Sequence, residues 1–382
     1  MSQQKRFDGA PLVLVGGAVA QRPGVGGHAW VFLHWLLGLR ALGCEVAFVD
    51  RLLPTEDAAQ SSEEAPSSEE AQPSEEAQIA WLQAVFAPHD LPVLLCGRDR
   101  LPRADLLLDV MGYTGAPADQ RVFVDVDPGF GQLWAELGLH DPYGDYDAFV
   151  TVGSAIGTPT STVPTRGLDW IPVLPPVFLP AWPASDGGPV WTTVGSWRGP
   201  NGPVEQDGKS YGLRVHEFRQ LLEVAAGGPP IELSMQIDPA DDGDRHNLLD
   251  AGFRLADPAV NAATPERYRR YVQSSAGELC VAKSLYVATG GGWFSDRSAG
   301  YLASGRPVVA QETGWSAALP SGEGLLAFTD TGGARDALAE VGAAPTRHSA
   351  AARELAREHL SSSVVLGALL DRLGQTSRSG AR

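Results

Sequence analysis

Residues 290–314 carry the sequence GGGWFSDRSAGYLASGRPVVAQETG, which predicts a loop, a short helix and a buried strand in succession. Three glycines open the stretch, and Ser295 follows as a good N-cap for a helix that Gly305 ends. The run PVVAQ that comes next is typical of a short buried strand. Since the first turn of a helix presents unpaired backbone N–H groups, this N-terminus suits a phosphate or diphosphate.

Four side chains at this predicted helix N-terminus are candidates for ligand contacts: Ser295, Asp296, Arg297 and Ser298. We expect Arg297 to bind phosphate oxygens together with free backbone amides of the glycine loop. Units of loop, helix and strand are common in α/β proteins, so the pattern alone is equally compatible with a structural role.

Residues 301–309, YLASGRPVV, resemble the nucleotide-sugar-binding segment of GT-B glycosyltransferases, and the longer match GWFSDRSA-x-YLASGRPV resembles bacterial, actinomycete-like members. The resemblance implies two Rossmann-like, doubly wound domains that face a cleft, with a nucleoside-diphosphate sugar held by the second. Many retaining members place a ribose-binding glutamate on this helix, where this chain has Gly300. Ribose recognition is therefore expected to use Asp296 or Ser298. The resemblance also implies that the turn at Thr313 and Gly314 contacts the donor sugar.

Three further cations in the second half are candidates for donor binding. Arg198 follows a predicted strand, in the loop that the resemblance brings to the donor diphosphate. Lys209 lies in a predicted long loop at residues 199–212. Lys283 follows a predicted strand at residues 279–282, at the carboxyl end where ligands collect in open α/β sheets. Lysine is rare in this chain, so a lysine at a given position indicates that its compact charge is needed there.

The first half predicts a strand, a helix at residues 28–42 and a second strand, which form a βαβ unit and imply a parallel sheet. Its glycines do not match the dinucleotide fingerprint, so no nicotinamide cofactor is expected. The resemblance places Gly26 and Gly27 in a loop at the floor of the cleft. It also suggests His28 as the base that deprotonates an acceptor hydroxyl; the alternative is a histidine that only holds the loop.

A predicted strand at residues 122–126 ends in the sequence Asp125-Val126-Asp127. An Asp-x-Asp pair after a strand is the metal site of the other large glycosyltransferase fold, GT-A. That alternative predicts a metal-dependent transferase. Within a GT-B cleft, Asp127 is instead a candidate base or a ligand for acceptor hydroxyls.

Composition excludes several classes of function. A net charge of -17 argues against binding to a nucleic-acid polymer, which requires basic surface. No apolar run approaches the ~20 residues of a membrane span, and the first residues lack the apolar core of a signal peptide. The cysteines lie far apart without metal-ligand spacing, so we expect no metal site and a cytoplasmic protein.

The sequence predicts two domains followed by C-terminal helices. Residues 1–185 form the acceptor-side domain, residues 186–345 the donor domain, and residues 346–382 helices that pack back toward the first domain. Residues 55–78 contain the repeat SSEEAP, SSEEAQ, PSEEAQ, which predicts a disordered acidic insertion. A helix is expected at residues 79–86.

These observations predict a metal-independent, hexosyltransferase-type enzyme that moves a sugar from a nucleoside-diphosphate donor to a small-molecule acceptor, such as a natural product. The nucleotide sugar acts as co-substrate, and no cofactor is expected. The missing helix glutamate keeps open a sugar-nucleotide epimerase or a catalytically silent GT-B subunit. The base, the sugar, the acceptor, the stereochemical outcome and the oligomeric state do not follow from the sequence.

Overall fold

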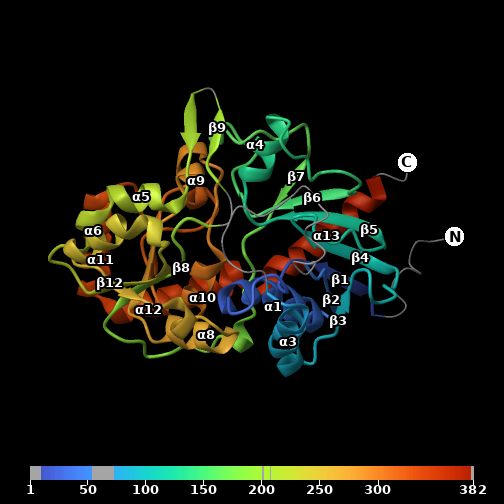
Figure 1. The fold of residues 1–382 in the computed structure, drawn as a ribbon, viewed down its shortest axis with the longest axis horizontal. Coiled ribbons are helices and arrows are strands. Elements are labelled where there is room, and N and C mark those ends of the chain that lie inside the picture. The colour runs from blue at the N-terminus through green and yellow to red at the C-terminus, as the bar shows by residue number, and fades with distance from the viewer. Residues whose placement is uncertain (1–9, 54–72, 200–201, 207, 380–382) are drawn as a thin grey trace.

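The first domain is built on a parallel sheet with the strand order β3-β2-β1-β4-β5-β6-β7 (Figure 1). The structure, a computed structural model, describes residues 10–53, 73–199, 202–206 and 208–379. The strands are β1 (Leu12–Gly16), β2 (Glu45–Asp50), β3 (Val93–Leu95), β4 (Ala104–Val110), β5 (Ala118–Asp125), β6 (Ala148–Thr151) and β7 (Trp170–Pro172). The helices are α1 (Gly26–Ala41), α3 (Glu75–Phe86) and α4 (Phe130–Glu136). Strand order reverses beside β1, which β2 and β4 flank.

The second domain has a parallel sheet with the order β12-β11-β8-β13-β14-β15. Its strands are β8 (Trp191–Ser196), β11 (Ile231–Gln236), β12 (Arg254–Ala256), β13 (Gly277–Cys280), β14 (Val308–Gln311) and β15 (Leu325–Phe328). Its helices are α5 (Arg214–Gln220), α6 (Asp242–Asp250), α7 (Pro258–Asn261), α8 (Pro265–Gln273), α9 (Ser284–Thr289), α10 (Asp296–Ala303), α11 (Thr331–Ala343) and α12 (Pro345–Leu355). Strand order reverses between β8 and β13, so this sheet is also doubly wound.

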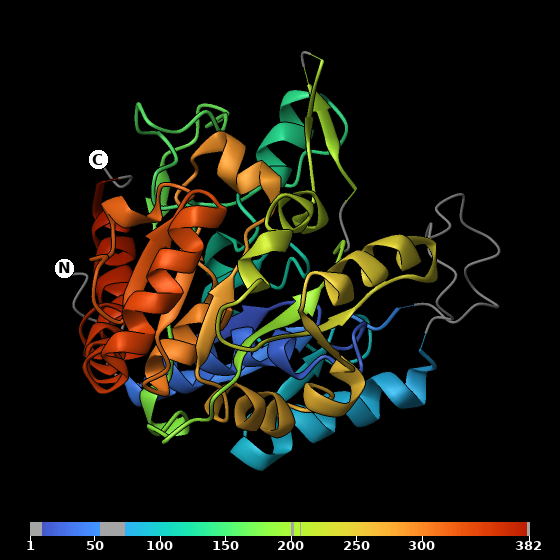
Figure 2. The ribbon, with the colours of Figure 1, turned by 90° about the vertical axis from the view of Figure 1, so that its left-hand side faces the viewer.

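The sequence of α1 is apolar on every side because the helix is packed on several sides. It packs on β2 of its own sheet, on α8 of the second domain and on α13 (Ser362–Ser379), the last helix. Gly38 allows the close approach of α13, because a Cβ there would lie 2.6 Å from Ser362 Cβ. The last described helix thus packs on the first domain, as Figures 1 and 2 show by the red helix beside the blue one.

Two segments differ from the sequence prediction. The α3 helix begins inside the last acidic repeat, because Ser74 caps it and Gln78 is fully buried with a hydrogen bond from its Nε2 to the Pro73 carbonyl. The prediction of a disordered segment is therefore wrong for residues 73–78, while residues 55–72 lie outside the described part. The predicted loop at residues 199–212 contains an antiparallel hairpin of β9 (Val204–Gln206) and β10 (Lys209–Tyr211).

Within the described residues, no helix combines the length and apolar character needed to cross a bilayer.

Candidate active site

The two sheets meet through the loops that follow their strands. Asp127, after β5 of the first sheet, contacts Lys283, after β13 of the second. The N–H of Ser154 also donates to Gly292 O across the domains, at 3.2 Å. The N–H of Gly26 donates to Ala262 O at 2.8 Å. The carboxyl ends of both sheets therefore face each other, which is where open α/β sheets bind ligands.

Lys283 and Asp127 form an ion pair between the domains. The ammonium Nζ lies 2.8 Å from Asp127 Oδ1 and 2.7 Å from Oδ2, and the Tyr286 hydroxyl donates to the same carboxylate. Burial lowers the pKa of Lys283, and the Asp127 carboxylate opposes that shift. Two sequence-predicted residues are thus brought together, although the prediction gave them separate substrates.

Arg214, at the first position of α5, places a second cation at the point where strand order reverses. Its Nε donates to Val281 O at 3.1 Å and its Nη1 to Ser196 O at 2.9 Å, so it bridges the ends of β13 and β8. Burial, and secondarily the neighbouring Arg297, lower the pKa of Arg214 to about 10. Sequence reasoning missed this residue. An arginine in the first turn of a helix, where a cation is disfavoured, was the available signal.

The loop after β1 presents groups from the first domain. The Asp50 carboxylate holds this loop by accepting from the N–H groups of Val19 (2.9 Å) and Ala20 (2.8 Å). Arg22, on the same loop, is exposed, yet desolvation lowers its pKa while Asp127 opposes the shift. Exposure together with desolvation is expected of a side chain in a concave surface. Arg22 was also missed by sequence reasoning.

His28 follows that loop, in the first turn of α1. Its Nε2 lies 2.9 Å from Ala18 O, which assigns the proton to Nε2 and leaves Nδ1 as the basic atom. Burial, with a contribution from Arg22, lowers the pKa of His28 to about 4, so the ring is neutral at pH 7. Nδ1 forms no hydrogen bond to a described residue. The position is compatible with a base and with a loop-holding histidine.

The phosphate contact predicted for Arg297 is contradicted by its partner, because a buried carboxylate already holds its guanidinium, whereas the equally buried Arg214 is held by backbone carbonyls. The Arg297 side chain is 8 % exposed, and its Nε donates to the fully buried carboxylate of Glu278 on β13. Burial acts to lower the pKa of Arg297, but Glu278 together with Cys280 and Tyr268 outweighs burial, so the pKa is raised. Ser298 Oγ donates to the other Glu278 oxygen at 2.6 Å, so the ribose contact predicted for Ser298 is wrong as well. Arg297 neutralises the buried Glu278 carboxylate beneath α10, and Ser298 donates a hydrogen bond to it.

The glycine loop also differs from its prediction. The N–H of Gly290 donates to Tyr286 O at 3.1 Å, and that of Gly292 donates to Thr313 O at 2.7 Å. The Gly292 carbonyl accepts from Ser154 Oγ of the first domain at 2.9 Å. A Cβ at Gly292 would lie 2.5 Å from the backbone nitrogen of Ala155, so the missing side chain permits this approach. The loop joins the domains, and these two amides are not free for phosphate.

Arg198 and Lys209 lie on the surface. Arg198 places Nε 2.6 Å from Asp241 Oδ2 and Nη2 2.5 Å from Oδ1, so its fork is filled by a carboxylate. Its predicted phosphate contact is not supported by this geometry. Lys209 is exposed on the β9–β10 hairpin, with Nζ 5.0 Å from the ring centre of Tyr211.

Thr313 and Gly314 support the glycine loop. The Thr313 hydroxyl donates to Trp293 O at 2.6 Å, and a Cβ at Gly314 would lie 2.9 Å from Gly290 O. Thr313 is 2 % exposed, so its hydroxyl does not face a ligand.

Ser295 and Asp296 have the predicted helix positions. Ser295 caps α10 by accepting from the N–H of Arg297 at 3.2 Å, and it is 2 % exposed. Asp296 is exposed in the first turn, while desolvation raises its pKa. Of the two residues expected to recognise ribose, only Asp296 is therefore accessible.

Gly26 and Gly27 begin α1 and do not lie in the loop before it, which corrects the predicted helix start at residue 28. A Cβ at Gly26 would lie 2.2 Å from the carbonyl of Thr264, and one at Gly27 would lie 2.7 Å from Tyr268. Both glycines let α1 touch α8 of the second domain.

Asp125 and Asp127 point to different partners. Asp125 is 2 % exposed and accepts from Gln132 Nε2 at 2.7 Å and from Thr151 Oγ1 at 3.0 Å. Burial raises the pKa of Asp125 to about 6. Among the described residues, no group of three or more His, Cys, Asp or Glu side chains is arranged to hold a metal ion. Asp125 is held inside the first domain by Gln132 and Thr151, while Asp127 is bound to Lys283 of the second domain, so the two carboxylates have different partners.

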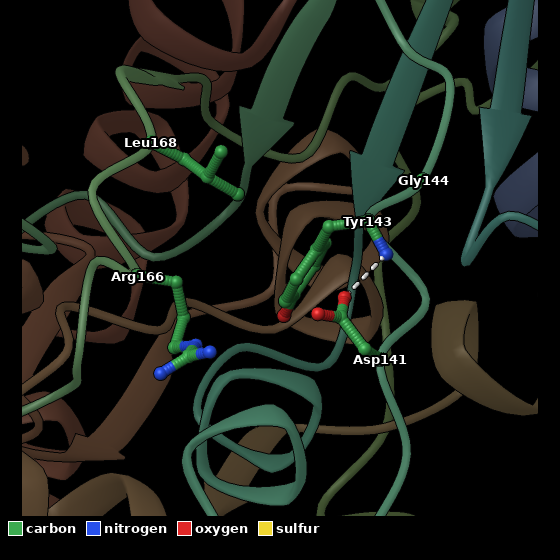
Figure 3. Close-up of a pocket in the computed structure, with 5 residues that line it drawn as sticks. All are labelled: Asp141, Tyr143, Gly144, Arg166 and Leu168. Atoms are coloured by element: carbon green, nitrogen blue, oxygen red, sulfur yellow. Dashed lines mark hydrogen bonds between the residues drawn. The ribbon is translucent and has the colours of Figure 1, made fainter. Parts of the chain in front are cut away.

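Two surface cavities lie outside this charged centre. One, of about 260 Å³, is lined by Asp141, Tyr143, Gly144, Arg166 and Leu168 (Figure 3). A neighbouring cavity of about 420 Å³ shares Leu168 and extends to Trp170 on β7. Neither is lined by the ion pair or by His28. The convergence of charge locates the candidate site better than cavity volume does.

Comparison with known proteins identifies the fold. No known family's sequence profile and no curated protein sequence matches the chain. An alpha-glucosyltransferase in complex with UDP-glucose and DNA has a similar structure, with 12 % identity over 96 % of this chain and 100 % of that one, at a TM-score of 0.59. HepE of Anabaena, in complex with UDP and glucose, has 10 % identity over 96 % and 100 %, at 0.55. Sucrose-phosphate synthase of Thermosynechococcus elongatus has 12 % identity over 96 % and 99 %, at 0.52. The chain therefore has the two-domain GT-B fold that these glycosyltransferases share.

Proposed function

We propose that this protein is a glycosyltransferase that binds a nucleoside-diphosphate sugar in the cleft and transfers the sugar to a small-molecule acceptor. The observation that carries the proposal is the convergence of Arg214 and Lys283 beyond the carboxyl ends of β8 and β13. The similar structures support it, because those proteins are glycosyltransferases and two of them hold UDP or UDP-glucose.

The two cations would act on the leaving group. As the bond between the sugar and the diphosphate breaks, negative charge builds on the diphosphate oxygens. A positioned cation stabilises that developing charge more than it stabilises the bound donor, and so lowers the barrier. Each charge-assisted hydrogen bond would contribute ~1.5–3 kcal/mol. This role requires no metal, since Arg214 and Lys283 supply the positive charge.

The first domain would supply the acceptor side. His28 has its basic Nδ1 without a hydrogen bond to a described residue, and Asp127 lies at the contact between the domains. Either could accept the proton of an acceptor hydroxyl. The net charge of -17 favours a small acceptor, such as a natural product, over DNA, because a polyanion requires basic surface.

Donor binding is the direct test. We would measure thermal unfolding with UDP-, TDP-, GDP- and ADP-sugars, because a ligand that binds only the folded state raises the melting temperature. The expected result is stabilisation by one class of nucleotide. Arg214→Gln and Lys283→Gln should each weaken binding about tenfold or more.

The matched control is Arg219→Gln, on the same helix as Arg214. The half-exposed Arg219 fork is bound to the carboxylate of Asp244, at 2.9 and 2.8 Å, so this variant should bind the nucleotide as the wild type does. Equal binding by the wild type and both site variants would reject the site.

A catalytically silent donor-binding subunit is the second candidate. One observation favours it: Gly300, at the position of the missing helix glutamate, faces Trp182, and a Cβ there would lie 2.9 Å from the indole ring. Slow release of nucleoside diphosphate without an acceptor would support the transferase. Binding without any hydrolysis or transfer would support the silent subunit.

A further inference from the structure

The ion pair between the domains occupies the cation that the donor would need. Lys283 has three N–H groups, and its nitrogen lies within 2.8 Å of both oxygens of Asp127. Two aromatic rings also lie beside the ammonium, with the Phe130 ring centre at 4.6 Å and that of Tyr286 at 5.3 Å. The Lys283 side chain is 11 % exposed. A second anion at this ammonium would therefore compete with Asp127 for its N–H groups.

We propose that Asp127 is an internal stand-in for the donor diphosphate, and that the donor binds by displacing this carboxylate from Lys283. The inference rests on the proposed function, and it adds a competition between the chain's own carboxylate and the substrate. Asp127 belongs to the first domain and Lys283 to the second, so the pair also fastens the two domains together while no donor is bound. We refer to Asp127, Lys283 and Tyr286 as the latch.

Tyr286 positions the carboxylate in the latch. Its hydroxyl donates to Asp127, and its ring stacks on Trp293 with centres 4.4 Å apart and planes inclined by 22°. Trp293 precedes α10 and pairs with Gly153 of the first domain, so the ring of Tyr286 rests on the domain junction. The tyrosine thus holds Asp127 on Lys283 without carrying a charge of its own.

The test compares nucleotide affinity among three variants by calorimetry. The probe is whichever of UDP, TDP, GDP and ADP stabilises the chain most. Asp127→Asn removes the competing charge and should tighten binding about tenfold. Tyr286→Phe loosens Asp127 while leaving every charge in place, and it should tighten binding about threefold. Glu136→Gln, on α4 close to Asp127 in sequence, removes a charge that pairs with Arg166 and should bind as the wild type does.

Because Tyr286→Phe changes no charge, it separates an effect of the latch from electrostatic repulsion between the nucleotide and the acidic protein. If Asp127→Asn and Glu136→Gln tighten binding alike while Tyr286→Phe does not, the negative field of the domain is responsible and the latch is rejected. If the nucleotide binds the wild type and neither latch variant binds more tightly, the latch is rejected and the proposed function stands. If no nucleotide binds the wild type or Asp127→Asn, both are rejected.

Stability without nucleotide gives an independent reading. Asp127→Asn should lower the melting temperature of the free chain, because the partly buried Lys283 loses its counter-ion. Saturating nucleotide should remove most of that difference, since the diphosphate replaces the lost carboxylate. A deficit that persists unchanged at saturation would contradict the substitution of one anion by the other.

Discussion

The Nδ1 atom of His34 accepts a hydrogen bond from the backbone N–H of Phe178 at 3.0 Å. His34 lies on α1, and Phe178 lies in the segment that leads from the first sheet to the second. The ring is 3 % exposed and packs between Trp30 and Trp182, with ring centres 5.0 and 5.8 Å away. Because Nδ1 is an acceptor here, the contact exists only while the ring is neutral.

Stability should therefore fall in mild acid. Burial lowers the pKa of His34 from 6.5 to about 3, so below pH 6.5 the unfolded chain takes up a proton that the folded chain refuses. The stabilisation is complete above pH 6.5 and is lost as the pH falls toward 3. For this residue, the loss between pH 7.5 and pH 5 is about 2 kcal/mol. Urea unfolding of the wild type and of His34→Gln at both pH values measures it.

The difference in pH dependence of stability between the wild type and His34→Gln isolates the contribution of His34. Burial raises the pKa values of Asp50 and Asp125 to about 6, and these groups act in the opposite direction. The folded chain holds their protons longer, so their contribution to stability falls as the pH rises from about 4 to 6. Both chains share this effect. Identical pH dependence in the wild type and His34→Gln would contradict a neutral, buried His34.

Arg297 should matter for folding. Its guanidinium neutralises Glu278, which is fully buried, so Arg297→Met leaves a buried charge without a partner. Loss of one member of a buried pair costs ~3–5 kcal/mol. We expect Arg297→Met to lower the free energy of urea unfolding by that amount, and Glu278→Gln combined with Arg297→Met to recover part of it. A variant with wild-type stability and no nucleotide binding would restore Arg297 to the donor site.

Sequence patterns predicted the fold because the strands are short apolar runs with clear ends. The predicted strand at residues 307–311, for example, coincides with β14 to within one residue, and Ser295 caps α10 as predicted. Helix α6 was missed because residues 242–250 are polar and only one of their leucines is buried. An element that buries many apolar side chains has a recognisable apolar pattern in its sequence. A helix that buries few of them has no such pattern.

The candidate site was only partly predictable, because a residue type does not reveal its partner. In parallel sheets, ligands bind beyond the carboxyl ends of the strands. The sequence places Lys283, Asp127 and His28 after strands or glycine turns, and the structure places them at the domain contact. Arg297 has the same charge and a similar position, but Glu278 lies on the neighbouring strand and takes its guanidinium. That partnership depends on the packing of α10 on β13, for which the sequence has no local signal.

Gly300 should resist replacement by any side chain. It lies in α10 with Trp182 beside it, and a Cβ would meet two atoms of the indole at 2.9 and 3.0 Å. Trp182 is fully buried against α1 and α8, through Trp30 at 5.1 Å and Tyr268 at 6.1 Å, so it has little room to move. Overpacking of this kind costs ~1–3 kcal/mol. Gly300→Ala should therefore lower the free energy of unfolding, although alanine favours helices.

The matched control is Gly367→Ala in α13, where a Cβ would meet nothing within 4 Å. There the alanine should raise stability by up to ~1 kcal/mol, because only the helix preference changes. Gly300→Glu, which restores the glutamate of the resembling segment, should destabilise the chain more than Gly300→Ala, since it must place a larger and charged side chain against the indole. The opposite outcome is a Gly300→Glu variant that is as stable as the wild type and binds nucleotide sugar more tightly. It would show that α10 can turn this position toward the cleft, and that contact with Trp182 is not the reason for a glycine here.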